Sequence, residues 1–146
     1  MKRYQDFLNE SRLMRLNEGG NAIKINVRPI KQTEIEATLN DFETKIFSKL
    51  GLEKEDWCLL GSAGKKLPNE VSGDLDLGIS LFKICDALNC SIEDLFESLS
   101  EFFTKNFPTL EINPMKGMFV FSVGFPIVPF DGNVVQVDLM PTDDLD

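Results

Sequence analysis

The chain contains no histidine, and this absence excludes several common kinds of catalytic site. Serine–histidine–aspartate and cysteine–histidine nucleophiles, histidine-ligated zinc and a histidine general base all need an imidazole. Any chemistry must therefore use carboxylates, lysines, hydroxyls or thiols.

Cysteine is scarce, and long apolar runs are missing. Three cysteines, an odd number with no C-x-x-C spacing, do not make a disulfide framework, so we expect Cys58, Cys85 and Cys90 to be reduced and buried in a reducing compartment. No run of about 18 apolar residues is present to span a bilayer. The polar start "MKRYQDFLNESR" also lacks the apolar centre of a signal peptide. We expect a soluble, cytoplasmic protein with no membrane partner.

Positive charge is also in short supply. The formal net charge of -9 argues against a sequence-independent nucleic-acid binder, because such binding depends on lysine and arginine clusters. The 146 residues are 42% hydrophobic and include twelve phenylalanines, which is enough apolar material for one compact core. One globular domain is expected.

The first 32 residues differ from the rest. They are locally basic and are interrupted by Gly19-Gly20, so we expect an amphipathic leader helix followed by a linker over 1–32 and a catalytic domain over 33–146. The apolar side of the leader helix would consist of Tyr4, Phe7, Leu8 and Met14.

Helical patterns recur in the domain. Thr33 and Glu36 fit a capping box, and Gly51 supplies a C-terminal stop. Between them, apolar residues recur at helical spacing at Ile35, Leu39, Phe42, Ile46 and Leu50. The run "LFKICDAL" predicts a short helix ending near Asn89. Ser91 is expected to cap a further helix reaching about Phe107, with the apolar stripe Ile92, Leu95, Phe96, Leu99, Phe102 and Phe103.

Strand patterns alternate with these helices. "WCLL" and "LDLGIS" predict two strands joined by a polar loop over 62–73, and "TLEIN", between two prolines, predicts an edge strand. "MFVFSVGF" and "NVVQVDLM" predict two further strands, with a turn at Asp131-Gly132 between them. The expected fold is α+β, a small mixed β-sheet with helices packed on one face.

The stretch "LLGSAGKKLPNEVSGDLDLGIS" superficially resembles a phosphate loop. A Walker A loop needs G-x-x-x-x-G-K followed by serine or threonine. Here Gly61 and Gly64 are separated by only two residues, and Lys66 stands where the hydroxyl is needed. The Walker interpretation therefore fails.

The aspartates in this stretch predict a metal site. Asp74 and Asp76 stand at i and i+2 on an expected strand, so both side chains leave one face, roughly 6–7 Å apart at the backbone. Such a pair suits magnesium, and a two-metal site needs a third carboxylate. Asp138 is favoured for its place in an apolar strand, and Asp143 or Asp144 is the alternative.

These motifs together resemble the signature of the nucleotidyltransferases of the DNA polymerase beta superfamily. A strand ends in Gly61-Ser62, the next strand carries Asp74-x-Asp76, and a later strand carries Asp138. The resemblance covers about 33–144 and implies the nucleotidyltransferase fold.

The resemblance also implies a role for each of these residues. Gly61 would let the backbone approach the triphosphate, and Ser62 would contact a terminal phosphate. Asp74 and Asp76 would bind the metals that carry the nucleotide, and Asp138 would complete a site for two Mg²⁺ ions. The expected reaction moves a nucleoside monophosphate from NTP, such as ATP, to an acceptor hydroxyl on RNA, a protein or a small molecule, and releases pyrophosphate.

Two features near the motif leave alternatives open. Lys65 and Lys66 would neutralise phosphate charge or form a solvated loop. Members of the family generally continue into helices beyond the third aspartate, whereas this chain ends eight residues after Asp138. The alternative is a catalytically weak or inactive module that acts as a binding partner or virion component. A helical partner subunit or a homodimer is a further expectation.

The N-terminal leader resembles that of internal head proteins of T-even-like phages. In those leaders a protease cuts after an apolar-x-Glu sequence, which matches Leu16-Asn17-Glu18 and Leu8-Asn9-Glu10 here. The resemblance implies a phage protein in the host cytoplasm, or one packaged in the virion. The alternative is an ordinary amphipathic helix packed on the domain.

Overall fold

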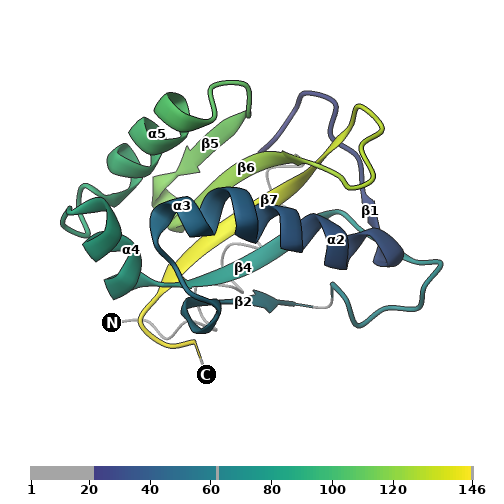
Figure 1. Ribbon diagram of the computed structural model, residues 1–146, viewed down its shortest axis with the longest axis horizontal. Coiled ribbons are helices and arrows are strands. Elements are labelled where there is room, and N and C mark those ends of the chain that lie inside the picture. The colour runs from purple at the N-terminus through teal and green to yellow at the C-terminus, as the bar shows by residue number, and fades with distance from the viewer. Residues whose placement is uncertain (1–21, 62, 146) are drawn as a thin grey trace.

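Five strands form one mixed sheet at the centre of the molecule (Figure 1). The computed structural model of the chain describes residues 22–61 and 63–145. The order across the sheet is β2-β4-β7-β6-β5, in which β4 and β7 are parallel and the other neighbours are antiparallel. The strands are β2 Trp57–Leu60, β4 Asp74–Ser80, β5 Ile112–Met115, β6 Val120–Pro126 and β7 Val134–Thr142.

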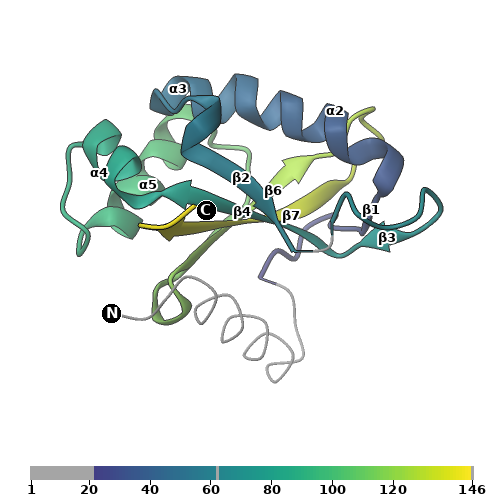
Figure 2. The same cartoon turned by 90° about the horizontal axis from the view of Figure 1, so that it is seen from below.

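The helices cover one face of this sheet (Figure 2). Within the described residues, no helix has both the length and the apolar content needed to cross a membrane. The predicted α+β class, with a small mixed sheet and helices on one face, is confirmed. The helices are α2 Gln32–Phe42, a π-helical segment Glu43–Phe47, α3 Ser48–Leu50, α4 Leu81–Leu88 and α5 Leu95–Asn106.

Phenylalanines join the helices to the sheet. The ring of Phe103 on α5 stacks on Phe121 of β6 at 5.5 Å between centroids, and Phe42 of α2 meets Phe125 edge-on at 4.9 Å. All four rings are almost completely buried. Rings in these arrangements add about 0.5–1.5 kcal/mol per pair to the effect of area burial. The main core therefore lies between the helical layer and one face of the sheet, and a smaller cluster of Met118, Val120 and Met140 is separate from it.

The first long helix ends at Leu50 as predicted, but it starts before Thr33 and contains a π-helical segment. It begins at Gln32, because the carboxylate of Glu34 accepts the backbone N–H of Lys31 at 2.9 Å. The predicted capping box at Thr33 is therefore wrong by two positions. The π-helical segment holds one residue more per turn than an α-helix, so Phe47 is buried together with Ile46.

The helix predicted for "LFKICDAL" is confirmed as α4, but the next helix starts later than expected. α4 ends at Leu88, and Asn89 caps it with a left-handed backbone (φ 52°). α5 begins only at Leu95, so Ser91 does not cap it; the Ser91 hydroxyl instead bonds the Asp94 carboxylate at 3.3 Å. Ile92, predicted to face the core, is 49% exposed because it precedes the helix.

The C-terminal strands follow the prediction closely. β5 is an edge strand as expected, although it starts at Ile112 and includes Pro114, which an edge strand tolerates. β6 and β7 pair as an antiparallel hairpin. The predicted turn between them contains Gly132 at φ 91°, a conformation that favours glycine.

The described part of the N-terminal region lies against the domain. The short strand β1, Ile30–Lys31, pairs with β3, Val71–Ser72, and Arg28 donates its backbone N–H to Val134 at 2.9 Å. Residues 22–31, assigned to the linker from sequence, therefore contact the sheet directly. The leader helix with its cleavage sequences lies outside the described residues, and the boundary at residue 32 stays a prediction.

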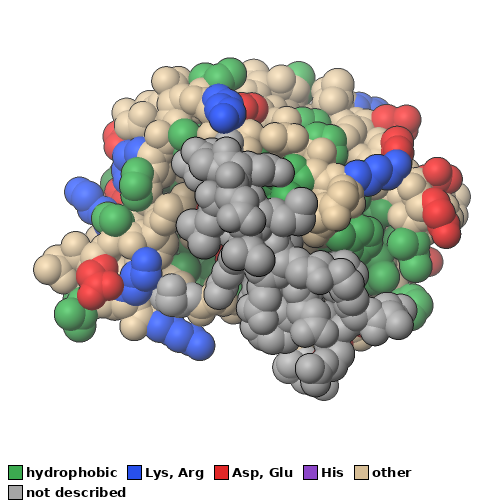
Figure 3. All heavy atoms as spheres, turned by 180° about the vertical axis from the view of Figure 1, so that it is seen from behind, with side chains coloured by type: hydrophobic (Ala, Val, Ile, Leu, Met, Phe, Trp, Pro, Cys, Tyr) green, Lys and Arg blue, Asp and Glu red, His purple; other side chains and the backbone are tan. Residues whose placement is uncertain are grey.

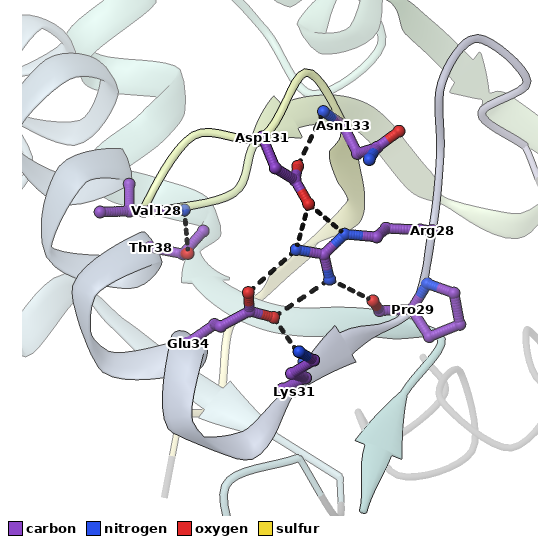
Figure 4. Close-up of polar contacts among 8 residues, drawn as sticks. All are labelled: Arg28, Pro29, Lys31, Glu34, Thr38, Val128, Asp131 and Asn133. Carbon is purple, nitrogen blue, oxygen red and sulfur yellow. Dashed lines mark hydrogen bonds and ion pairs between the residues drawn. The ribbon is translucent and has the colours of Figure 1, made fainter.

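Arg28 ties this region to two other parts of the chain (Figure 4). Its guanidinium donates to both carboxylate oxygens of Glu34 on α2, at 3.1 and 2.9 Å, and to Asp131 in the loop after β6, at 3.0 Å. It also donates to the carbonyl of Pro29. The hydrogen bond from Arg28 holds the pKa of Glu34 below its usual range, against the opposing effect of burial.

Arg28→Ala is expected to destabilise the fold by about 1 kcal/mol near neutral pH. Because the folded-state pKa of Glu34 is depressed, the contribution of this pair is present above the unfolded pKa of 4.5 and is lost as pH falls through the folded value. Urea unfolding at neutral pH and at about pH 3 measures this difference. The gap between wild type and variant should narrow in acid, and an equal gap at both pH values would contradict the assignment. Lys45→Ala, in an exposed pair with Asp41, is the control.

The three cysteines are free thiols, as predicted, but they are half-buried rather than buried. Burial, reinforced by the neighbouring Cys90 thiol, raises the pKa of Cys85 to about 11. Burial also raises the pKa of Cys58. Cys58 and Cys85 are therefore poor nucleophiles at neutral pH, because the thiolate is the reactive form.

Candidate metal centre

Three aspartates converge on the sheet face opposite the helical layer. Asp76 of β4 and Asp138 of β7 are direct partners in the parallel register, and Asp74 stands two residues before Asp76. One carboxylate oxygen from each of the three lies within 4.8 Å of the others. The predicted same-face geometry of the first two aspartates is confirmed, and the strand aspartate predicted as their partner joins them.

Strand alternation explains why these side chains share a face. Successive strand residues point to opposite faces. Leu75 and Leu77 of β4, and Val137 and Leu139 of β7, are fully buried in the core beneath the helices. The residues between them must then point to the other face, where the aspartates lie.

The surroundings of the aspartates favour a cation. Asp138 is fully buried and Asp76 is 6% exposed, while Asp74 is half-buried. Bringing carboxylates together in a partly dry site is unfavourable unless protons or cations balance the charge. Hard carboxylate oxygens are the donors that Mg²⁺ and Mn²⁺ prefer. The donor set therefore fits a divalent metal.

The alternative third ligands lie elsewhere. Asp143 and Asp144 follow the end of β7, and Asp144 exchanges hydrogen bonds with the Thr142 hydroxyl through its backbone. Among the described residues, the group with metal-binding spacing contains Asp138 and neither of these two.

Two polar side chains donate hydrogen bonds to Asp138, and neither was predicted from the sequence as part of the site. The hydroxyl of Ser122, on β6, donates to Asp138 Oδ1 at 2.6 Å. The side-chain amide of Gln136 donates to the same oxygen at 3.0 Å and to Oδ2 at 3.3 Å. A signal was present, because "VQVDL" and "FSVGF" place polar residues at alternate positions of otherwise apolar strands.

The loop with the predicted phosphate contacts begins beside the aspartates. Leu60, the last residue of β2, is paired with Asp76, and Gly61 follows it directly. Gly61 has φ 73°, a left-handed conformation that favours glycine. Ser62 lies outside the described residues, and the phosphate-binding roles of Gly61 and Ser62 stay predictions.

One side chain from α2 fixes both ends of this loop. The amide oxygen of Gln32 accepts the Gly64 backbone N–H at 2.7 Å, and its NH₂ group donates to the Ser72 hydroxyl at 3.1 Å. Ser72 lies two residues before Asp74. The loop is therefore anchored near its start and again at the entry to β4.

The two lysines of the loop differ in their surroundings. The Lys66 amino group donates to the Val71 carbonyl at 2.8 Å, so it closes the loop, while Lys65 is exposed. Lysine and arginine side chains are visible at the left edge of the rear view, the end of the molecule that carries this loop (Figure 3). The predicted contact of both lysines with phosphate is untested.

Comparison with known proteins does not identify a family for the chain. No protein-family model matches the chain, and no curated protein matches it. Among solved structures it is similar to an antigenic nucleotidyltransferase-like protein from Paracoccidioides brasiliensis, at 18% sequence identity and a TM-score of 0.47. The match covers 79% of this chain and 49% of that one, so the chain spans about half the length of that protein.

Proposed function

We propose that the protein is a metal-dependent nucleotidyltransferase. In the proposed reaction an acceptor hydroxyl oxygen bonds to the α-phosphorus of an NTP, the bond to the β-phosphate oxygen breaks, and pyrophosphate leaves. The convergence of Asp74, Asp76 and Asp138 carries the proposal. Three carboxylates on adjacent strands, beside a loop that starts with a left-handed glycine, are a donor set suited to a metal–triphosphate complex.

Each aspartate has its own part in this proposal. Asp74 and Asp76 would hold the Mg²⁺ that accompanies the triphosphate, and Asp138 would help to hold a second ion. When bound, Mg²⁺ would supply charge neutralisation on the phosphates and at the leaving group. Asp138 lies deepest of the three and would accept the proton of the attacking hydroxyl.

The backbone at Gly61 would serve the phosphates. Without a side chain, this residue lets the main chain approach the triphosphate closely, and backbone N–H groups in such turns bind anions. The two hydrogen bonds of the Gln32 side chain, to Gly64 and Ser72, would hold the loop in position while the nucleotide binds. The position of the loop beside Asp76 supports these proposed roles.

A labelling experiment tests the proposed reaction. The full chain is incubated with each α-³²P-labelled NTP, Mg²⁺ and a host lysate that supplies acceptors. We expect a labelled acceptor with wild type and none with the Asp74→Ala/Asp76→Ala double variant. Equal labelling by both proteins would rule out the proposal. NTP binding by calorimetry without any labelling would favour the non-catalytic module.

A further inference from the structure

A short stretch of chain outside the predicted catalytic domain lies beside Asp138. The Asn113 amide donates to the Ala22 carbonyl at 3.1 Å. The Glu111 carboxylate accepts the backbone N–H groups of Lys24 and Ile25, at 3.0 and 2.8 Å. Residues 22–25 are thus fixed to the sheet by side chains of β5 and of the residue before it.

Ile23 sits at the centre of this stretch and is fully buried. Its side chain lies over Gly124 of β6, where an added Cβ would come within 2.9 Å of Ile23 Cγ2. That separation is too short for real carbon atoms, so glycine is what allows the chain to lie this close to the strand. The Ile23 backbone N–H then points at Gln136 and donates to its Oε1 atom at 3.1 Å.

This hydrogen bond determines which end of the Gln136 amide faces the candidate metal centre. A backbone N–H can only donate, so the amide oxygen must face Ile23. The NH₂ group must then face Asp138, where it donates at 3.0 and 3.3 Å. Gln136 is only 1% exposed, so water does not compete with these two hydrogen-bond partners.

We infer that Gln136 is a positioning residue for Asp138, and that the backbone N–H of Ile23 sets its orientation. The inference rests on the proposed metal centre. With the Ser122 hydroxyl as a second donor, the Asp138 carboxylate is held in one rotational position. A metal ligand held in this way loses less freedom when the ion binds. Residues that hydrogen-bond to metal ligands typically contribute about 10- to 100-fold in metal affinity.

The test measures Mn²⁺ binding by the full chain in the absence of nucleotide, by calorimetry and electron paramagnetic resonance. Gln136→Met keeps the length of the side chain but removes the donor. We expect its Mn²⁺ affinity to fall roughly 10-fold or more, with a changed spectrum of the bound ion because Asp138 is no longer held in one position. An unchanged affinity and spectrum would overturn the role of Gln136.

The role of the Ile23 backbone N–H in orienting Gln136 is tested separately. Ile23→Pro removes the N–H, and an amide-to-ester replacement at Ile23 removes it without a ring should the proline variant not fold. Either is expected to weaken Mn²⁺ binding in the same direction as Gln136→Met, with no further loss when the two are combined, because both act through one amide. Ile23→Val keeps the N–H and should bind like wild type. Wild-type affinity in the ester variant would overturn the role of Ile23.

These outcomes separate the inference from the proposed function. Wild-type Mn²⁺ binding without transfer would count against the reaction and leave the positioning result standing. Wild type that binds no Mn²⁺ would overturn both, since there would be no metal ligand to position. Thermal unfolding of each variant without metal shows whether a lost affinity merely reflects lost folding.

Discussion

Asparagine in place of Asp76 is expected to lower the rate of nucleotidyl transfer by about 10³-fold. The substitution keeps the shape of the side chain but removes one of the three negative charges in the group. Metal ions stabilise transition-state charge by several kcal/mol, and each 1.36 kcal/mol is a factor of about ten in rate. Loss of one anionic ligand next to the triphosphate should remove most of that effect.

The same variant should also lose its response to metal. A ligand that binds only the folded state stabilises it by about 2.7 kcal/mol at 100 times its dissociation constant. Mg²⁺ or Mn²⁺ is therefore expected to raise the melting temperature of wild type and leave Asp76→Asn unchanged. Asp86→Asn, an exposed aspartate on α4, is the matched control and should behave like wild type. Equal metal-induced stabilisation of Asp76→Asn and wild type would contradict the metal centre.

Phe103→Ala is expected to destabilise the fold by about 3–5 kcal/mol. The Phe103 ring is fully buried and packs on Phe121 of the sheet and on Phe102 and Phe107 of its own region. Removing it deletes one of two ring contacts between α5 and Phe121, the other being Phe96, and leaves a cavity that surrounding rings fill only in part. A loss of this size is a large share of the total stability of a domain.

Chemical denaturation monitored by circular dichroism measures this effect. Phe130→Ala provides a control with the same chemical change, because Phe130 is 70% exposed in the loop after β6. Its effect should stay within about 0.5 kcal/mol. Similar losses for the two variants would show that α5 does not pack on the sheet as described.

The sequence allowed the central strands and the aspartate group to be predicted for a simple reason. In "LDLGIS" and "NVVQVDLM" the apolar side chains alternate with polar ones, and strand alternation places the two sets on opposite faces of the sheet. Asp74 and Asp76 therefore had to share a face. Asp138 was favoured as the third carboxylate for its place in an apolar strand, but its direct pairing with Asp76 was not predicted, because strand order is not encoded locally.

Other features depend on tertiary contacts and could not be predicted. Ser91 has the chemistry of a helix cap, but local propensity is weak and the helix starts four residues later at Leu95. Residues 22–31 have no strong periodicity, and their place is set by partners far along the chain, such as Glu111 and Val134. Gln136 was visible as a polar residue in an apolar strand, but its partner Ile23 was not.

The direct pairing of Asp76 with Asp138 also has a consequence for how the protein folds. The two strands are far apart in the chain, and joining them in parallel closes a long loop, which is a slow step in folding. A slip of one residue in this register would turn Asp138 toward the phenylalanine core. The ability to capture a metal ion therefore arises only once the central pair has docked in the correct register, so metal capture reports the completion of the sheet during refolding.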